Sequence, residues 1–441
     1  MNAKSVRYTL ALAVGLTTLT AAAIGIARLL AMIPVVKDDW ALFVAVSLLL
    51  VFLVLLVARY LSLMWLGYLH HLEARVADPT PEGTWLPPVT ILVPCYNEGA
   101  VIARAIESLL ELDYPMFEVL VIDDGSTDDT REAVAPLEGR HGDVTVRLVS
   151  KGNGGKASAL NTGIALARHD YILAMDGDSR LTRDTLRAAM RHFGDPRVGA
   201  VAGNVKVTNR RNLWTKLQAL EYIEGLNMAR RAQGFLRAVN IIPGPIGIFR
   251  RDVLLAVGGY DTDTYAEDAD LTLKLLTAGW HIAYEDRAIA WTEAPEQLLD
   301  LLKQRYRWTR GILQALRKRA SFLVLPRHGF GVWLSVNLMF FEGIVWPAVN
   351  ILGNGLFAVL AIRSGAGEMV LFWWLLLTML DVVAAVYTVA MEEEELSLVL
   401  YAVVYRFVFI NIIDVAKLMA TVEEFLGVRM SWGKLERAGR L

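Results

Sequence analysis

The chain has 441 residues, of which 55% are hydrophobic and 20% are charged, and its formal net charge is −2. This length predicts more than one structural unit, and the near-zero charge argues against a nucleic-acid-binding protein. The single cysteine, Cys95, excludes an internal disulfide and a cysteine-rich metal site.

Apolar blocks open the chain. Residues 8–33 and 40–57 carry almost no charge, and each is long enough to cross a bilayer, which takes about 20 residues. The first block is too long for the apolar core of a cleaved signal peptide. We therefore expect a transmembrane hairpin over residues 1–78, and Lys4 and Arg7 favour a cytoplasmic N-terminus.

Residues 79–319 have the composition of a soluble domain, in which short apolar strands alternate with helices. Strands are predicted at residues 89–93, 117–122, 144–150 and 171–175. This alternation predicts an α/β domain with a mostly parallel sheet and helices on both faces. Ligands bind beyond the carboxyl ends of such strands. Five polar residues fall there: Asn97, Asp123, Asp124, Asp176 and Asp178.

Asp176 and Asp178 follow the fourth strand with one glycine between them. An Asp-Gly turn is the simpler explanation, but two adjacent like charges favour a bound cation. Mg²⁺ is commonly held by one or two carboxylates together with substrate phosphates. We therefore expect Mg²⁺ or Mn²⁺ at this pair, where it would neutralise a leaving diphosphate.

A glycine-rich loop, GNGGKA at residues 152–157, precedes a predicted helix. It fits a dinucleotide-binding pattern, but it follows the third strand rather than the first. It does not fit a P-loop, because Ala157 stands where Ser or Thr must follow the lysine. Its amides, the helix N-terminus and Lys156 are suited to bind an anion.

Three more apolar blocks follow the domain, at residues 332–362, 369–391 and 396–425. The first is long for one crossing and is interpreted as a broken helix or a tight pair, so residues 320–441 are expected to cross three or four times. Three crossings place the basic tail outside, against the positive-inside tendency, and four place it inside. The basic residues of this tail are Arg429, Lys434, Arg437 and Arg440.

Seven segments in this order resemble the membrane-embedded processive family-2 glycosyltransferases, which include the synthases of poly-N-acetylglucosamine, hyaluronan, chitin and cellulose. They are PCYNE, VIDDGSTD, GNGGKASALNTG, AMDGDS, GPIGIFRR, YAEDADLTLKL and QRYRW. The resemblance implies a GT-A-type cytoplasmic domain between transmembrane helices. It also implies a UDP-sugar donor bound with a divalent metal, inversion of the anomeric centre and export of the polymer.

The resemblance also implies roles for residues on the donor side. Asp124, with Asp123, would contact the uracil, and Lys156 would contact the nucleotide. Asp176 and Asp178 would be the metal-binding pair, with Asp178 as the main ligand. The first nucleotide loop would contain Tyr96, Asn97 and Glu98.

On the acceptor side, the resemblance implies that the catalytic acids are Asp268 and Glu267, with Asp268 as the general base. The threonine of the family's T-E-D motif is replaced here by Ala266. Gly244 would lie in a loop near the acceptor sugar. The family's Q-x-x-R-W motif is matched by three residues that share a helical face: Gln304, Arg307 and Trp308.

The residues themselves support these roles. Asp268 lies where an amphipathic helix is predicted to begin, and a helix N-terminus stabilises the ionised carboxylate that a base requires. The simpler alternative is that Asp268 only caps the helix. Trp308 offers an apolar surface for a sugar ring, and Arg307 can pair with phosphate. Alternatively, their helix lies on the membrane surface and its cations meet lipid headgroups.

We therefore predict an inverting, metal-dependent, processive glycosyltransferase that polymerises a UDP-sugar, with UDP-N-acetylglucosamine favoured, and exports a β-linked polysaccharide. Its expected partners are the donor, the growing polysaccharide and the lipid bilayer, with no nucleic acid. Its expected location is the inner (plasma) membrane, multi-pass, with a cytoplasmic catalytic domain. Three alternatives stay open: a hyaluronan- or chitin-type synthase, a non-processive transferase to a lipid carrier, and a non-enzymatic scaffold. A need for a small membrane partner subunit is also open.

Overall fold

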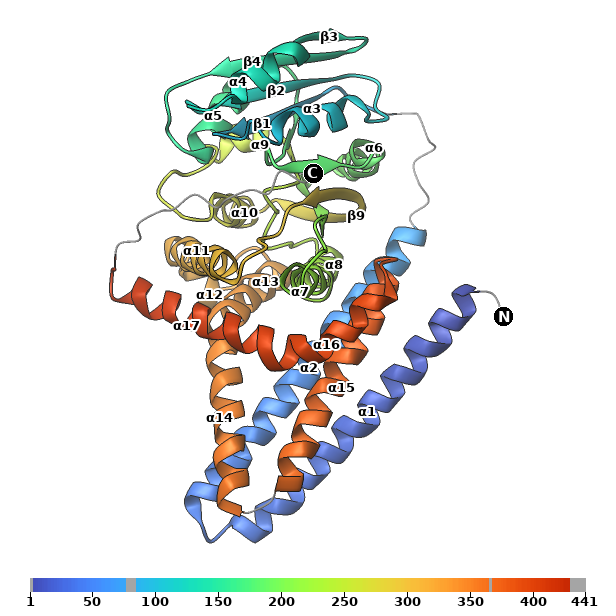
Figure 1. Cartoon of the computed structure of the whole chain (residues 1–441), viewed down its shortest axis with the longest axis vertical. Helices are drawn as coiled ribbons and strands as arrows, with labels where there is room; N and C mark the ends of the chain where they lie inside the picture. The colour runs from blue at the N-terminus through green and yellow to red at the C-terminus, as the bar shows by residue number, and fades with distance from the viewer. Residues whose placement is uncertain (1–2, 77–84, 365–366, 429–441) are drawn as a thin grey trace.

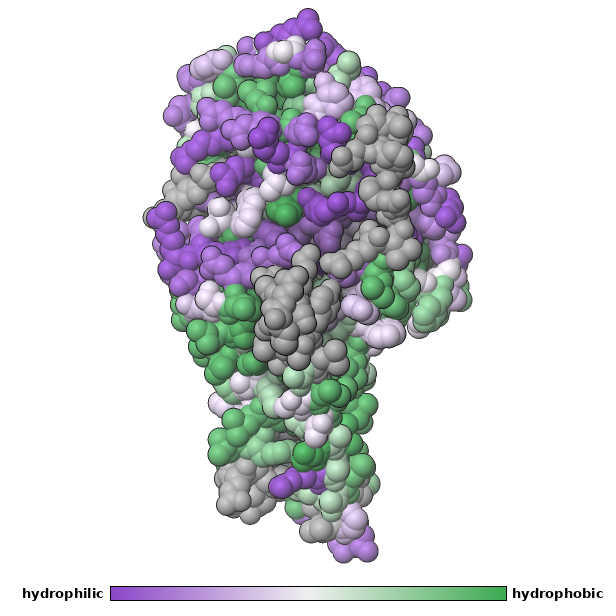
Figure 2. Space-filling model, turned by 90° about the vertical axis from the view of Figure 1, so that its right-hand side faces the viewer, coloured by the Kyte–Doolittle hydropathy of each residue, from purple (hydrophilic) through white to green (hydrophobic). Residues whose placement is uncertain are grey.

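The computed structural model describes residues 3–76, 85–364 and 367–428. A domain built around one sheet stands on a stalk of long helices (Figure 1). The stalk is mainly apolar on its surface, whereas the surface of the domain is mainly hydrophilic (Figure 2). The predicted boundary at residues 78–79 and the basic tail from Arg429 onward lie outside the described residues.

The sheet has nine strands in the order β3-β4-β2-β1-β5-β8-β7-β9-β6. The four strands expected from the sequence are parallel neighbours in the order β4-β2-β1-β5. The later strands pair differently: β8 is antiparallel to both β5 and β7, and only β7 and β9 are parallel. The bounds are β1 (Val89–Cys95), β2 (Phe117–Asp123), β3 (Gly139–His141), β4 (Val144–Ser150), β5 (Tyr171–Ala174), β6 (Ser179–Leu181), β7 (Val198–Val207), β8 (Gly247–Arg250) and β9 (His281–Thr292).

Helices cover both faces of the sheet, as predicted. Alternate residues of a strand point to opposite faces, so Ile91 and Val93 of β1 join one buried core and Leu92 joins the other. The α/β fold class is confirmed, with a sheet that is parallel in its first half and mixed as a whole. The helices of the domain are α3 (Ile102–Leu110), α4 (Thr130–Val134), α5 (Lys156–Leu166), α6 (Thr185–Met190), α7 (Leu213–Glu221), α8 (Met228–Phe235), α9 (Arg251–Ala256), α10 (Glu267–Thr277), α11 (Leu298–Lys318) and α12 (Ser321–Val324).

Within the described residues, four helical segments are long and apolar enough to cross a membrane: Leu42–Glu73, Phe330–Val359, Leu371–Met391 and Leu396–Phe425. In Figure 1, α1, α2, α14 and α15 run down the stalk, whereas α17 lies across their upper ends, beneath the domain. The bounds are α1 (Ala3–Val36), α2 (Trp40–Val76), α13 (Phe330–Phe340), α14 (Trp346–Ser364), α15 (Gly367–Met391), α16 (Ala402–Val404) and α17 (Ile410–Phe425).

Three π-helical turns interrupt the helices where the domain meets the stalk. They are η3 (Tyr222–Asn227), η4 (Phe341–Val345) and η6 (Tyr405–Phe409). η4 joins α13 to α14, so the long apolar block after the domain is one interrupted helix rather than a pair. The three turns line one open cavity with a volume of ≈ 140 Å³. Such turns are frequent at functional sites.

Candidate active site

The carboxyl ends of β1, β2 and β5 bring the predicted donor residues to one edge of the sheet. Cys95 at the end of β1 pairs in register with Asp123 at the end of β2. β5 ends at Ala174, and the chain continues directly into the loop that carries Asp176 and Asp178. The sequence pattern therefore placed these groups on the correct edge.

Asp123 is completely buried and bonded to its own loop. Its carboxylate accepts a hydrogen bond from the Ser126 amide at 2.8 Å and pairs with Arg131 at 2.5 Å. Burial raises the pKa of Asp123, but the hydrogen bonds from Ser126 and the Arg131 charge outweigh burial and hold that pKa below its ordinary value. In this structure Asp123 orders the loop in which Asp124 lies.

Asp124 binds the glycine-rich loop. Its carboxylate accepts hydrogen bonds from the amides of Gly154 at 3.1 Å and Gly155 at 2.7 Å, and Lys151 lies 2.6 Å away. The sequence suggested that these amides would bind a ligand anion, whereas here they bind the carboxylate of the protein. Asp124 therefore fixes the shape of the loop that leads into α5.

The first loop after β1 is held against the second. Asn97 has a positive φ of 53°, and its side-chain oxygen accepts a hydrogen bond from the Thr127 amide at 2.8 Å. The Glu98 amide donates to the Thr130 hydroxyl at 2.8 Å. The side chain of Tyr96 is exposed, so it is the member of this trio most accessible to a ligand.

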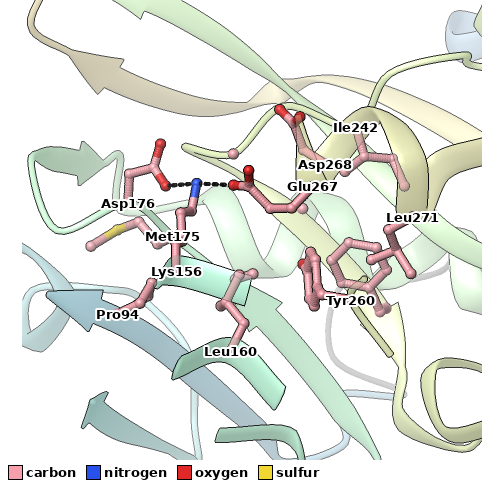
Figure 3. Close-up of a pocket in the computed structure, with 14 residues that line it drawn as sticks. Pro94, Lys156, Leu160, Met175, Asp176, Ile242, Tyr260, Glu267, Asp268 and Leu271 are labelled. Carbon is pink, nitrogen blue, oxygen red and sulfur yellow. Dashed lines mark ion pairs between the residues drawn. The ribbon is translucent and has the colours of Figure 1, made fainter. Parts of the chain in front are cut away.

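Lys156 is the centre of the candidate site. Its ammonium lies 2.6 Å from Asp176 and 2.8 Å from Glu267, so one cation bridges the carboxyl end of β5 and the start of α10 (Figure 3). Burial lowers the pKa of Lys156, but Asp176, Glu267 and Asp268 outweigh burial and raise that pKa well above its ordinary value. The pocket around it is also lined by Tyr260.

Glu267 and Asp268 are adjacent but differ in charge environment. Burial raises the pKa of Glu267, yet the Lys156 ammonium outweighs burial, so this pKa lies below its ordinary value. Burial, then the neighbouring Glu267 charge, raise the pKa of Asp268 to about 6, although Lys156 and the Ala269 amide lower it. The helix N-terminus stabilises the ionised carboxylate as expected, because Asp268 accepts a hydrogen bond from the Ala269 amide at 2.8 Å. Burial has the larger effect, so the pKa of Asp268 is raised. A carboxylate with this pKa is mainly ionised at neutral pH and can accept a proton.

Gly244 is in close contact with this cluster. A β-carbon built on Gly244 would lie 2.8 Å from the Lys156 ammonium and 2.9 Å from an Asp176 oxygen. A side chain at this position would displace the lysine or the carboxylate. The glycine predicted to lie near the acceptor therefore directly contacts the donor-side charges.

The residues of the predicted Q-x-x-R-W motif lie on α11. The buried Gln304 accepts a hydrogen bond from Arg305, and the Arg305 guanidinium lies 4.1 Å from the Trp308 ring centre. The charge of Arg307 lowers the pKa of Glu267, which brings α11 into the electrostatic field of the Lys156 cluster. One aromatic face of Trp308 is therefore occupied by Arg305.

Residues 87–311 match the family described as "Glycosyltransferase like family 2", which is about half of the chain. The chain belongs to glycosyltransferase family 2. A poly-beta-1,6-N-acetyl-D-glucosamine synthase of Staphylococcus aureus (strain COL) is 34% identical over 270 residues, which are 60% of this chain and 64% of that protein. The Staphylococcus epidermidis protein of the same name is 35% identical over 257 residues, 58% of this chain and 61% of that one. The match thus spans less than two thirds of these relatives.

A solved structure shows the same fold. The mannosyltransferase PcManGT from Pyrobaculum calidifontis, in complex with GDP-Man and Mn²⁺, superimposes with a TM-score of 0.60 at 24% identity, and the match covers 85% of this chain and 98% of that one. The GT-A-type fold expected from the sequence is confirmed.

Several contacts of the candidate site were not predicted from the sequence. Lys151 pairs with the predicted residue Asp124, Arg305 lies over the ring of the predicted residue Trp308, and Tyr260 lines the pocket. Lys151 could have been noticed, because it immediately precedes the glycine-rich loop. Tyr260 comes from a distant loop, and no sequence pattern marks it.

Proposed function

We propose that this family-2 chain is an inverting glycosyltransferase that transfers N-acetylglucosamine from UDP-N-acetylglucosamine to a growing β-linked polysaccharide and exports the product. One observation carries the proposal: Asp268, with a pKa of about 6, lies in the same pocket as Lys156 and Asp176. A poised base therefore lies beside a cation and a candidate metal ligand. The names of the staphylococcal relatives support the choice of sugar.

In the proposed reaction, Asp268 accepts the proton of an acceptor hydroxyl as that oxygen attacks the anomeric carbon of the donor. The bond from this carbon to the diphosphate breaks on the opposite face, so UDP leaves with the electron pair and the configuration inverts. The Lys156 ammonium and the Arg307 guanidinium offset the negative charge of the diphosphate. The proton on Asp268 passes to solvent after the product moves on.

Asp176 and Asp178 would hold the divalent metal. The fit rests on the donor set, because carboxylate oxygens are the ligands that Mg²⁺ and Mn²⁺ prefer. The Asp176 carboxylate already attracts the Lys156 ammonium at 2.6 Å, and Asp178 is buried with only 3% of its surface exposed. When bound, the metal would neutralise the leaving diphosphate.

The cavity at the three π-helical turns is the proposed start of the export path. Its lining combines aromatic rings, such as Trp346 and Tyr405, with charged groups. Glu342 pairs with Arg59 of α2 at 2.9 Å and lines this cavity. Aromatic faces and hydrogen-bonding groups suit the two surfaces of a sugar ring. We place the domain in the cytoplasm and the stalk in the plasma membrane.

The test is UDP release by the purified, detergent-solubilised protein with Mg²⁺ or Mn²⁺ and each of several nucleotide sugars. We expect turnover with UDP-N-acetylglucosamine alone and none after substitution Asp268→Asn. Turnover only when UDP-glucuronic acid is also present would favour a hyaluronan-type synthase. Binding of the donor without turnover would favour the scaffold alternative. If the purified chain is silent but membranes are active, a small partner subunit is required.

A further inference from the structure

The segment from Leu396 to Phe425 has the length and apolarity of a membrane-crossing helix. Thirty residues of helix extend about 45 Å, whereas the hydrocarbon core is about 30 Å thick. Length and composition therefore permit a crossing. The contacts at the two ends of the segment argue against it.

The start of the segment is bonded to the sheet domain. Glu392, four residues upstream, pairs with Arg231 of α8 at 2.7 Å and accepts a hydrogen bond from Asn204 of β7 at 2.6 Å. Glu394 pairs with Arg210 at 2.5 Å and with Lys206 of β7 at 3.0 Å. Both acids belong to the acidic run that follows α15, and their ion pairs hold the start of the segment against the domain.

The end of the segment is bonded to the same domain. Glu424 pairs with Arg310 of α11 at 2.7 Å, and both side chains are almost fully buried. Arg310 also donates to the Val428 carbonyl at 2.6 Å, and Glu423 accepts a hydrogen bond from Tyr306. A hydrophilic domain cannot lie on both sides of a bilayer, so two ends tied to it lie on one side.

Between these ends, the segment presents an apolar stripe. Val415, Met419, Val422 and Leu426 recur at spacings of four, three and four residues, which places them on one helix face. Each of these side chains is roughly half exposed or more, up to 73% for Leu426. Glu424, which pairs with Arg310 of α11, lies on the opposite face of the helix. An amphipathic helix of this kind lies in the plane of a membrane surface with its apolar face inserted.

We propose that α17 and the residues that follow it to Val428 lie along the bilayer surface on the side of the sheet domain, with the apolar stripe in contact with lipid. The lipid bilayer is the favoured occupant because α17 lies across the upper ends of the stalk helices (Figure 1), and the surface of that stalk is mainly apolar (Figure 2). The chain then crosses the membrane twice after the domain, through α14 and α15, rather than three or four times. Val428 ends on the domain's side, where the positive-inside tendency favours the basic residues that follow it in the sequence.

This arrangement also links the membrane surface to the candidate site. Arg310, which binds α17, lies two residues beyond Trp308 on α11. The position of α17 on the bilayer therefore helps to set the position of α11. The inference about the membrane surface does not depend on the donor or the product.

Cysteine labelling tests the sidedness directly, because the sole native cysteine, Cys95, is buried. Ser397→Cys and Val428→Cys mark the two ends of the segment in the full-length chain. Asp143→Cys marks the domain and Asp38→Cys marks the turn between α1 and α2; all four positions are solvent-exposed. The variants are treated with a membrane-impermeant maleimide in sealed inverted and right-side-out vesicles, and the parent chain is the blank.

We expect Ser397→Cys and Val428→Cys to react in the same vesicles as Asp143→Cys, and Asp38→Cys to react in the opposite ones. Reaction of the two end positions from opposite sides would overturn the proposal. So would reaction of both in the vesicles that label Asp38→Cys. The result is independent of enzymatic activity, so it stands apart from the proposed function.

A depth measurement tests the lipid contact. Nitroxides at Val415→Cys, Met419→Cys and Leu426→Cys are compared in vesicles of phosphatidylethanolamine and phosphatidylglycerol, using collisions with oxygen and with a water-soluble nickel chelate. A surface helix predicts similar shallow depths at all three sites, about 5–10 Å into the headgroup boundary. A depth that increases steadily from Leu426 to Val415, toward the middle of the segment, would indicate a crossing and would overturn the proposal. High nickel access, or protection from both reagents, would show water or protein over the stripe, and either would overturn the proposal.

Discussion

Replacing Asp268 by asparagine should abolish activity and stabilise the protein at the same time. The substitution keeps the shape of the side chain and its acceptor for the Ala269 amide at 2.8 Å, but it removes the charge. Loss of a general base costs about 10²- to 10⁴-fold in rate. A residue that only caps the helix would not show this loss, because asparagine is an equally good cap.

The gain in stability follows from the pKa of Asp268. A rise from 3.8 to about 6 means that ionising this carboxyl disfavours the folded state at neutral pH by at most about 3 kcal/mol, at about 1.36 kcal/mol per pKa unit. The side chain is partly exposed, so solvent screening reduces the expected value to about 1–2 kcal/mol. A domain of this size gains about 2–4 °C in melting temperature per kcal/mol.

The assay compares UDP release and thermal unfolding of the detergent-purified protein at pH 7.5. The matched control is Asp252→Asn, because Asp252 also lies in the first turn of a helix and accepts a hydrogen bond from the next amide at 2.8 Å, but it is exposed. We expect the control to keep its activity and its melting temperature. A variant Asp268→Asn that stays active, or that melts below the parent, would refute the assignment of Asp268 as a general base with a raised pKa.

Further predictions concern pH, the loop and the metal. If Asp268 must be ionised, kcat/KM should fall as the pH drops through about 6; a profile that is flat between pH 5 and 7 would contradict this. Lys156 lowers the pKa of Asp268, so Lys156→Met should move the acid limb of the pH profile to higher pH and raise the KM for the donor. An acid limb that stays at the same pH would show that Lys156 does not influence the ionisation of Asp268. Gly244→Ala should reduce kcat/KM on the order of 10- to 100-fold, because its β-carbon would lie 2.8 Å from the Lys156 ammonium and displace it. The melting temperature should not fall. Unchanged kinetics would show that this contact does not matter for the reaction. EDTA should abolish activity and Mn²⁺ should restore it in the parent but not in Asp178→Asn; activity that survives EDTA would exclude the metal.

The sequence predicted the first half of the domain well because its signals are local. Four short apolar strands end in polar residues, and the structure confirms those strands and the edge at which they meet. The second half was not predictable in detail. Strand β7 pairs with β9 about 80 residues later, and such long-range pairing leaves no local pattern.

The fine structure of the site was also beyond the sequence. No sequence pattern indicates that Asp124 binds the amides of the glycine-rich loop, or that Lys156 pairs with Glu267. Likewise, the segment Leu396–Phe425 has the length and composition of a crossing helix, and only the contacts at its two ends argue for the proposed surface location. The amino-acid composition gives the apolarity of a helix. Its orientation relative to the membrane depends on which groups form ion pairs and hydrogen bonds at its ends.

The central claim is that this chain builds a polysaccharide from one donor. The most direct measurement incubates the purified protein in proteoliposomes with radiolabelled UDP-N-acetylglucosamine and a divalent metal, then sizes the product on a gel after extraction with organic solvent. We expect a long, water-soluble polymer that accumulates without any second nucleotide sugar. A product of one added sugar that partitions into the organic phase would contradict it and would instead identify a transferase to a lipid carrier.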